Sequence, residues 1–282
     1  MIEFDGRGIL LDIEGTTSSI QFVYDVMFPF ARRELGRYLN EEWNQGNLLQ
    51  ACELLAIDAG HESFSEWQTA LVPAGEASSP ETIQQAIVTH VEQLMDQDIK
   101  STGLKSLQGL IWKSGFQSGE MEAHVYPDVP PALQQWKQAD LDLRIYSSGS
   151  IAAQKLFFGH SVAGNLLEWF SGHYDTTTGP KQETESYLQI ATDFNLPASQ
   201  ILFLSDVVAE LDAAATAGFQ TGLCQRPGNP PVEETGSHPR ITAFDQIQLA
   251  TLGKFVEQTT YRSAVTSLLA TSKPLTLELR FL

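Results

Sequence analysis

The sequence is poor in cysteine and in basic residues, and it has no long hydrophobic run. It contains two cysteines, Cys52 and Cys224, and neither lies in a CxxC or His/Cys metal-ligand pattern. Lys and Arg number 17 against 35 Asp and Glu, which gives a formal net charge of −18. Such a surface repels nucleic-acid phosphates and anionic lipid headgroups. We therefore expect no nucleic-acid partner and no membrane partner.

Three further features bear on where the protein acts. No apolar run approaches the roughly 20 residues that cross a bilayer. Residues 1–5 lack the basic and apolar regions of a signal peptide, and two cysteines without a disulfide framework fit a reducing compartment. We expect a cytoplasmic protein that works as a monomer. Its 282 residues allow one large domain or two modest ones.

From about residue 125 onward, short apolar runs alternate with helix patterns. Strands are predicted at 141–146, 200–204 and 221–224, and helices at 130–136, 150–158, 186–194 and 207–217. One further apolar run, residues 9–13, lies more than a hundred residues upstream and ends at a Gly-Thr-Thr-Ser turn. Strands separated by helices predict a parallel sheet with right-handed crossovers. The fold class is therefore α/β, with a Rossmann-like parallel-sheet core.

The long stretch between the first strand and the others is helical in pattern. Residues 82–99 carry apolar side chains at helical spacing, residues 26–39 and 48–57 also have helix patterns, and residues 72–80 form a loop. The predicted division is a core of residues 1–20 and 125–248, an inserted α-helical cap of residues 21–124, and a C-terminal extension of residues 249–282. Within the extension, 261–269 is amphipathic and 274–282 is strand-like. The sequence assigns the extension no role.

Polar side chains follow the predicted strands at the points where the strands end. They are Asp12 and Glu14 after the first strand, Ser147 and Ser148 after the strand 141–146, and Asp206 after the strand 200–204. Ligands of open α/β sheets bind outside the carboxyl ends of the strands. Lys181 joins this group if the loop 176–180 returns to the same edge.

This set suits phosphoryl transfer to a carboxylate. Mg²⁺ takes oxygen ligands, often one or two carboxylates with phosphate and water, and Asp12 and Asp206 can supply them. Lys181 can neutralise a phosphate oxygen, and the Ser147 hydroxyl can bind another. Asp12 can then attack phosphorus to give an aspartyl-phosphate that water cleaves.

Each residue taken alone also has a purely structural explanation. Asp12 and Ser147 can be turn or N-cap residues, Lys181 can be solvated surface, and Asp206 can cap the following helix. Glu210, on that helix, is expected on the solvent face, although one turn after Asp206 it could also point toward a metal-bound water. The functional interpretation therefore depends on the joint occurrence of these residues at one sheet edge.

In this order, the motifs resemble those of the haloacid dehalogenase (HAD) superfamily and, more narrowly, of the enolase-phosphatase family, also called acireductone synthases. The matching stretches are residues 11–17 (LDIEGTT), 107–112 (LQGLIW), 128–132 (DVPPA), 146–161 (YSSGSIAAQKLFFGHS), Lys181, 204–206 (LSD) and 226–229 (RPGN). The likeness spans about residues 5–248. It implies a HAD-like core with an inserted α-helical cap.

The resemblance implies a bifunctional reaction on a small phosphorylated substrate. In that family, 2,3-diketo-5-methylthiopentyl-1-phosphate is enolised and then dephosphorylated to the acireductone 1,2-dihydroxy-3-keto-5-methylthiopentene, a step of methionine salvage. The resemblance also assigns roles: Asp12 as nucleophile; Asp12, Asp206 and the backbone carbonyl of Glu14 as ligands of one Mg²⁺ per subunit; Ser147 and Ser148 as substrate contacts; and Lys181 as a phosphate contact. Asp12, Glu14 and Lys181 are thus the catalytic candidates.

Glu14 distinguishes this chain from most phosphatases of the superfamily, which have Asp at that position as a general acid. Its side chain is one methylene longer, and we hypothesise that it suits an enol leaving group or the preceding proton transfer. The enolising base is either Glu14 or a group on the helical insert. Several apolar residues of the insert are possible contacts for the thioether tail, although core packing is the simpler interpretation of each. They are Phe22, Met27, Phe28 and Trp112.

Two other functions account for part of the pattern. A different HAD phosphatase, acting on a sugar phosphate, would use the same residues. A response-regulator receiver domain would also combine acidic residues, Ser or Thr and Lys around a parallel sheet, but as a switch without substrate. The length, the helical insert after the first Asp, and Glu14 argue against the receiver domain.

Overall fold

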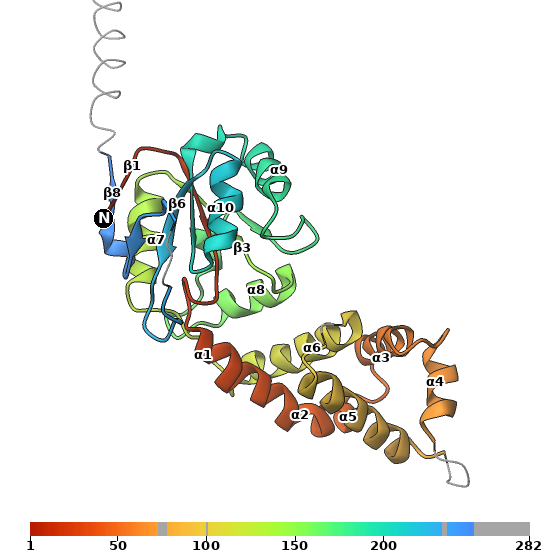
Figure 1. Ribbon diagram of the computed structural model, residues 1–282. Helices are drawn as coiled ribbons and strands as arrows, with labels where there is room; N and C mark the ends of the chain where they lie inside the picture. Colours follow the sequence, from red (N-terminus) through yellow and green to blue (C-terminus); the bar gives the residue numbers. More distant parts are fainter. Residues whose placement is uncertain (73–77, 100, 233–235, 251–282) are drawn as a thin grey trace, which may run out of the picture.

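A six-stranded parallel sheet forms the centre of the protein (Figure 1). The computed structural model describes residues 1–72, 78–99, 101–232 and 236–250. The strands lie in the order β4-β3-β2-β5-β6-β7, and every neighbouring pair is parallel. Their bounds are Gly8–Leu11 (β2), Asp142–Tyr146 (β3), Gly172–Tyr174 (β4), Ile201–Ser205 (β5), Gln220–Cys224 (β6) and Arg240–Ile241 (β7). The predicted α/β class is confirmed.

Helices cover both faces of this sheet. They are α7 (Val129–Gln138) and α8 (Ile151–Gly159) on one face, and α9 (Thr184–Phe194) and α10 (Val208–Thr216) on the other. Successive residues of β2 point to opposite faces, because Ile9 and Leu11 belong to the core with α7 and α8, whereas Leu10 belongs to the core with α9 and α10. The buried β2 therefore delivers the next residue, Asp12, to the carboxyl edge of the sheet.

Between β2 and α7, the described residues form helices that lie together away from the sheet (Figure 1). They are α1 (Ile20–Phe22), a π-helical turn (Val23–Met27), α2 (Phe28–Glu41), α3 (Gly46–Asp58), α4 (Phe64–Leu71), α5 (Pro80–Asp96) and α6 (Thr102–Ser118). The predicted helices at 26–39, 48–57 and 82–99 correspond to α2, α3 and α5. The sequence patterns did not predict α4 and α6. The boundaries of the cap at residues 21 and 124 stay predictions.

Two glycines allow α6 to pack directly on its neighbours in this helical part. A Cβ atom on Gly103 would overlap the backbone of Leu55 in α3. A Cβ atom on Gly115 would overlap the ring of Phe30 in α2. The close approach fixes α6 against both helices, and α6 in turn forms one wall of the cavity described below.

The outgoing and returning connections between the sheet and these helices lie side by side. The Tyr126 N–H donates to the Thr17 carbonyl at 3.0 Å, and the Ser19 N–H donates to His124 Nδ1 at 3.1 Å. The His124 ring also meets the Tyr126 ring edge-on, with centroids 5.1 Å apart. These contacts hold the start of α1 next to the segment that follows α6, so both helices leave the sheet near Asp12.

A second, two-stranded sheet pairs the two ends of the described chain. In it β1 (Ile2–Phe4) runs parallel to β8 (Ile247–Leu249). The patterns predicted at 261–269 and 274–282 lie outside the described residues, as does most of the predicted loop 72–80. None of the helices in the described ranges is both long enough and apolar enough to cross a membrane.

Candidate active site

Asp12 is the first residue beyond β2 and lies at the carboxyl edge of the sheet, as predicted. Its N–H donates to the Leu204 carbonyl of β5 at 3.0 Å, so the backbone stays in register with β5 as it leaves the strand. Its Oδ1 accepts a hydrogen bond from the Ile13 N–H at 2.8 Å. The residue is only 5% exposed, so its carboxylate needs buried partners.

Lys181 comes from the loop after β4 and supplies the buried cation. Its Nζ lies 2.8 Å from Asp12 Oδ1 and 2.7 Å from Glu210 Oε2. The Tyr187 hydroxyl donates to the Lys181 carbonyl at 2.7 Å, which holds the loop against α9. Burial alone would lower the pKa of Lys181, but the negative charges of Asp12 and Glu210 outweigh it and raise the pKa. Lys181 therefore stays a cation in this site.

The structure shows that the solvent-face prediction for Glu210 is wrong. Because α10 begins at Val208, its first turn lies beside the carboxyl end of β5 and Glu210 faces inward. Glu210 is buried, and its Oε2 accepts a hydrogen bond from Ser205 Oγ at 2.9 Å in addition to its contact with Lys181. The one-turn spacing after Asp206 was the sequence signal for this position.

Asp206 follows β5 directly and completes a group of three carboxylates. Burial and the negative charges of Asp12 and Glu210 raise the pKa of Asp206 to about 7. Burial and the charge of Asp12 likewise raise the pKa of Glu210 to about 7, against the lowering effect of Lys181. Three carboxylates thus share one ammonium group, and the site as a whole favours a further cation.

The donor set at this edge fits Mg²⁺. The ion usually binds through one or two carboxylates together with phosphate and water, and Asp12 and Asp206 offer those carboxylates. In the part of the chain that the structure describes, no group of three or more His, Cys, Asp or Glu side chains is arranged to hold a metal. The third ligand implied by the resemblance, the Glu14 backbone carbonyl, stays a prediction. Gly15, at φ 68°, packs so closely on Asp206 that a Cβ atom would overlap the carboxylate, which keeps this backbone beside Asp206.

Two residues of the stretch 226–229 hold the loop after Asp12 in place. Asn229 Nδ2 donates to the Gly15 carbonyl at 2.8 Å, and Arg226 Nε donates to the Thr16 carbonyl at 2.8 Å. Arg226 also pairs with Asp128 at 2.8 Å. Sequence reasoning gave these residues no role, because contacts across more than two hundred residues leave no local pattern.

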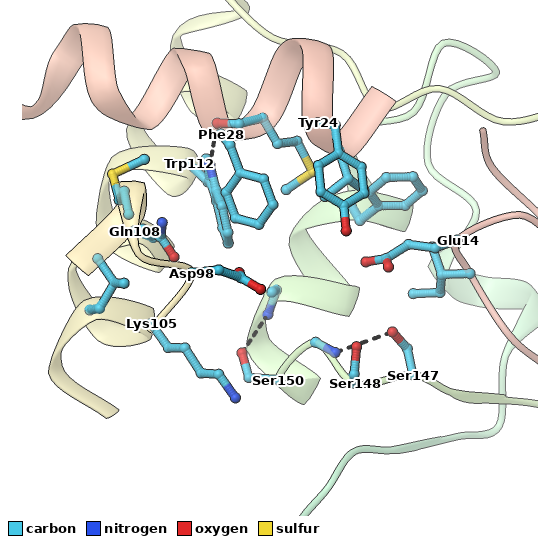
Figure 2. A pocket seen from close by; sticks show the side chains of 18 of the residues that line it. Glu14, Tyr24, Phe28, Asp98, Lys105, Gln108, Trp112, Ser147, Ser148 and Ser150 are labelled. Atoms are coloured by element: carbon cyan, nitrogen blue, oxygen red, sulfur yellow. Dashed lines mark hydrogen bonds between the residues drawn. The ribbon is translucent and has the colours of Figure 1, made fainter. Parts of the chain in front are cut away.

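The two predicted serines lie on the loop after β3, beside the cavity (Figure 2). Ser147 is buried, and its Oγ accepts a hydrogen bond from the Gly149 N–H at 3.2 Å. Ser148 is exposed and lines the cavity. Asp175 accepts a hydrogen bond from the Ile151 N–H at 3.0 Å, which fixes the start of α8 next to this loop.

A cavity of about 600 Å³ lies between this edge and the helical part of the chain, where the π-helical turn, α2, α5 and α6 line it. Figure 2 shows Glu14, Ser147 and Ser148 on one side of it and Asp98, Gln108 and Trp112 on the other. Its lining residues are Ile13, Glu14, Val23, Tyr24, Met27, Phe28, Pro29, Arg32, Leu94, Met95, Asp98, Ile99, Leu104, Lys105, Gln108, Trp112, Ser147 to Ser150, Ala153, Gln154 and Phe157. The cavity thus joins a polar end at the sheet to an end between helices where most lining side chains are apolar and four are polar, namely Arg32, Asp98, Lys105 and Gln108.

Three of the four apolar residues proposed as tail contacts line this cavity. They are Met27, Phe28 and Trp112. The indole N–H of Trp112 donates to the Met27 carbonyl at 2.8 Å, which fixes the ring as part of the wall. Phe22 is instead buried in the core, edge-on to Phe157 with centroids 5.8 Å apart, as the simpler interpretation predicted.

Comparison with known proteins gives consistent matches over most of the chain. A family model described as haloacid dehalogenase-like hydrolase matches residues 7–218. Proteins named Enolase-phosphatase E1 are 43% identical in Drosophila mojavensis (88% of this chain, 97% of the relative) and 45% identical in Synechococcus elongatus (85% and 96%). The crystal structure of the UTR4 protein from Saccharomyces cerevisiae is similar with a TM-score of 0.67 and 32% identity, covering 86% of this chain and 99% of that one.

These matches agree with the order of motifs along the sequence and with the arrangement of the strands. Identity above 40% extends over nearly the full length of relatives from an insect and a cyanobacterium. The matched region includes β2, β3 and β5, which are followed directly by Asp12, Ser147 and Asp206. The chain belongs to the enolase-phosphatase family of haloacid dehalogenase-like hydrolases.

Proposed function

We propose that the protein is an Mg²⁺-dependent enolase-phosphatase, an acireductone synthase of methionine salvage. Its substrate is 2,3-diketo-5-methylthiopentyl-1-phosphate, and its products are 1,2-dihydroxy-3-keto-5-methylthiopentene and phosphate. The observation that carries the proposal is the 2.8 Å contact of Asp12 with Lys181, next to a cavity lined by Glu14 and Ser147. The relatives named Enolase-phosphatase E1 support the same activity.

The phosphatase half uses Asp12 as the nucleophile. Its carboxylate attacks phosphorus, the bond from phosphorus to the ester oxygen breaks, and an aspartyl-phosphate forms, which water then hydrolyses. Lys181 donates to a phosphate oxygen while keeping Asp12 in place, and the Ser147 hydroxyl binds another. Bound by Asp12, Asp206 and the Glu14 carbonyl, Mg²⁺ would neutralise phosphate charge that otherwise repels the nucleophile.

The enolase half moves a proton from C1 of the substrate to the oxygen on C2. It needs a base beside C1 and a proton donor beside that oxygen. Glu14 fits the role of base, because its carboxylate faces the cavity in Figure 2 and stands two residues after Asp12. With phosphate held at Asp12, C1 is the carbon closest to this end of the cavity.

Replacing Glu14 by glutamine is expected to separate the two halves of the reaction. Acireductone formation should fall by about 10²- to 10⁴-fold, the usual contribution of a general base or acid. Hydrolysis of p-nitrophenyl phosphate should fall less, because p-nitrophenolate leaves without acid assistance. Steady-state rates on both substrates measure this, with the exposed Glu122→Gln as the matched control. Wild-type rates on both substrates would eliminate the proposed role of Glu14.

Mg²⁺ binding is expected to strengthen as the pH rises from 6 to 8. The pKa values of Asp206 and Glu210 are raised to about 7, above those of an unfolded chain, so the metal-free protein loses stability as pH rises toward 7. A bound Mg²⁺ ion displaces the protons of these carboxyl groups and balances their negative charge. The affinity of the protein for Mg²⁺ should therefore rise up to about tenfold per pH unit for each proton displaced. Calorimetric titration of the metal-free protein with Mg²⁺ between pH 6 and 8 measures the affinity, and two buffers of different ionisation enthalpy give the number of protons displaced. An affinity that does not change with pH would contradict the prediction.

The proposed activity is tested directly by incubating the protein with the diketo phosphate and Mg²⁺. Absorbance and NMR should show acireductone and inorganic phosphate appearing together. Phosphate without an enediol would leave only the phosphatase half. Faster turnover of common sugar phosphates would identify the protein as a different phosphatase of the superfamily.

The proposal extends to how the parts of the chain work together. Residues 21–124 act as a cap over the core of residues 1–20 and 125–248, supported by a cavity that both parts line. The enzyme is a cytoplasmic monomer with one Mg²⁺ per subunit. Light scattering should then give a mass near 31.1 kDa.

A further inference from the structure

Gln108 is a buried residue in the helical wall of the cavity. It lies on α6, is 6% exposed, and lines the cavity. Within the described residues, none makes a hydrogen bond to its side chain, although its amide carries two donors and an acceptor. The residue is buried, but its amide atoms are not among the fully enclosed ones and open onto the cavity, where a ligand can replace water as their hydrogen-bond partner.

Among the lining glutamines, Gln108 is the one whose amide is available to a ligand. Leu104, Met95 and Trp112 line the same part of the cavity, and the indole N–H of Trp112 is already donated to Met27. The other lining glutamine, Gln154, donates to the Gly149 carbonyl at 2.8 Å and the Tyr174 carbonyl at 2.7 Å, and its Oε1 lies 3.1 Å from His173 Nδ1. Gln154 is thus occupied, and Gln108 is not.

The chemistry of this position indicates which group it binds. A neutral amide flanked by Leu104, Met95 and Trp112 suits an uncharged oxygen, whereas the charged lining residues of the helical side, Arg32, Asp98 and Lys105, suit charged groups of a ligand. The opposite end of the cavity is lined by Ser147, which is one of the proposed phosphate contacts. A ligand spanning both would be a phosphate ester with a carbonyl oxygen along an otherwise apolar chain.

We propose that the Gln108 amide donates a hydrogen bond to an oxygen of the substrate's vicinal dicarbonyl, and that it selects oxo phosphates over esters without a carbonyl. This rests on the proposed function for the identity of the substrate. Gln108 exchanges no proton, because an amide does not ionise near neutral pH. The hydrogen bond from its N–H becomes stronger as negative charge develops on that oxygen during enolisation.

The test compares three inert phosphonates as inhibitors of p-nitrophenyl phosphate hydrolysis. They are hexyl, 3-oxohexyl and 4-oxohexyl phosphonate, in which a methylene replaces the ester oxygen. The wild type is expected to bind one of the oxo compounds about tenfold more tightly than hexyl phosphonate, the scale of one hydrogen bond to a ligand. Gln108→Leu should bind all three equally, whereas Gln117→Leu, exposed on the same helix, should keep the wild-type preference.

The outcomes separate this inference from the proposed function. A preference for the oxo compounds that survives in Gln108→Leu, or a wild type without any preference, overturns the role of Gln108. Acireductone formation by the wild type is measured independently, and its absence overturns the proposed function whatever the inhibitors show. Should leucine disturb the fold, Gln108→Met preserves the length of the side chain and removes the amide, and it decides the same question.

Discussion

Replacing Asp12 by asparagine is expected to abolish phosphate release from the diketo phosphate. The asparagine side chain keeps the shape of Asp12 but is a far poorer nucleophile, so no acyl-phosphate forms. The loss should be roughly 10⁴-fold or more, the scale seen when the nucleophile of a covalent enzyme is removed. Phosphate assays measure it, and acid-quenched wild-type enzyme should carry a trapped phosphoryl group that Asp12→Asn lacks.

The same variant has a second expected effect on the order of the two half-reactions. If enolisation precedes dephosphorylation and uses Glu14, Asp12→Asn should still convert the diketo phosphate to its enol phosphate, which would accumulate. An absorbance change without phosphate release reports this. The exposed Asp245→Asn serves as the control for loss of one negative charge. Phosphate release within tenfold of wild type would rule out Asp12 as the nucleophile.

The core of the site was predictable because its residues follow buried strands. β2, β3 and β5 are short apolar runs that end at polar residues, and the geometry of parallel sheets then places Asp12, Ser147 and Asp206 at one edge. The prediction for Lys181 was conditional, because β4 has three residues, Gly172–Tyr174, and no apolar run to mark it. The resemblance to a family then assigned that lysine the role of a phosphate contact.

Elements whose placement depends on distant contacts were less predictable. The helix α6 contains Gly103, Gly109 and Gly115, which lower helix propensity, and the reason for two of them is close packing on α2 and α3. The inward position of Glu210 follows from the need to pair Lys181, a residue 29 positions upstream. The one-turn spacing after Asp206 offered the inward position only as an alternative, because the pairing with Lys181 leaves no local pattern.

Lys181 should matter for stability as well as for catalysis, which makes Lys181→Met the more demanding test of the site. Removing the ammonium leaves Asp12 and Glu210 buried without their countercharge, and breaking a buried pair in this way typically costs about 3–5 kcal/mol. The raised pKa of Lys181 means that its contribution is fully present at any pH below its ordinary value and is lost only at strongly alkaline pH. The deficit should therefore appear across the neutral range.

The pH and Mg²⁺ dependence of that deficit distinguishes a buried charge imbalance from a simple loss of packing. In urea denaturation with EDTA, Lys181→Met should lose more stability at pH 8 than at pH 6. The pKa values of Asp206 and Glu210 are raised, so these carboxyl groups take up protons at the lower pH and repel each other less. Mg²⁺ should restore part of the stability but not the activity, because it replaces the missing charge and not the donor to phosphate. Lys113→Met, exposed on α6, should behave as wild type. A deficit that is the same at both pH values and unaffected by Mg²⁺ would mean that Lys181 contributes packing rather than charge.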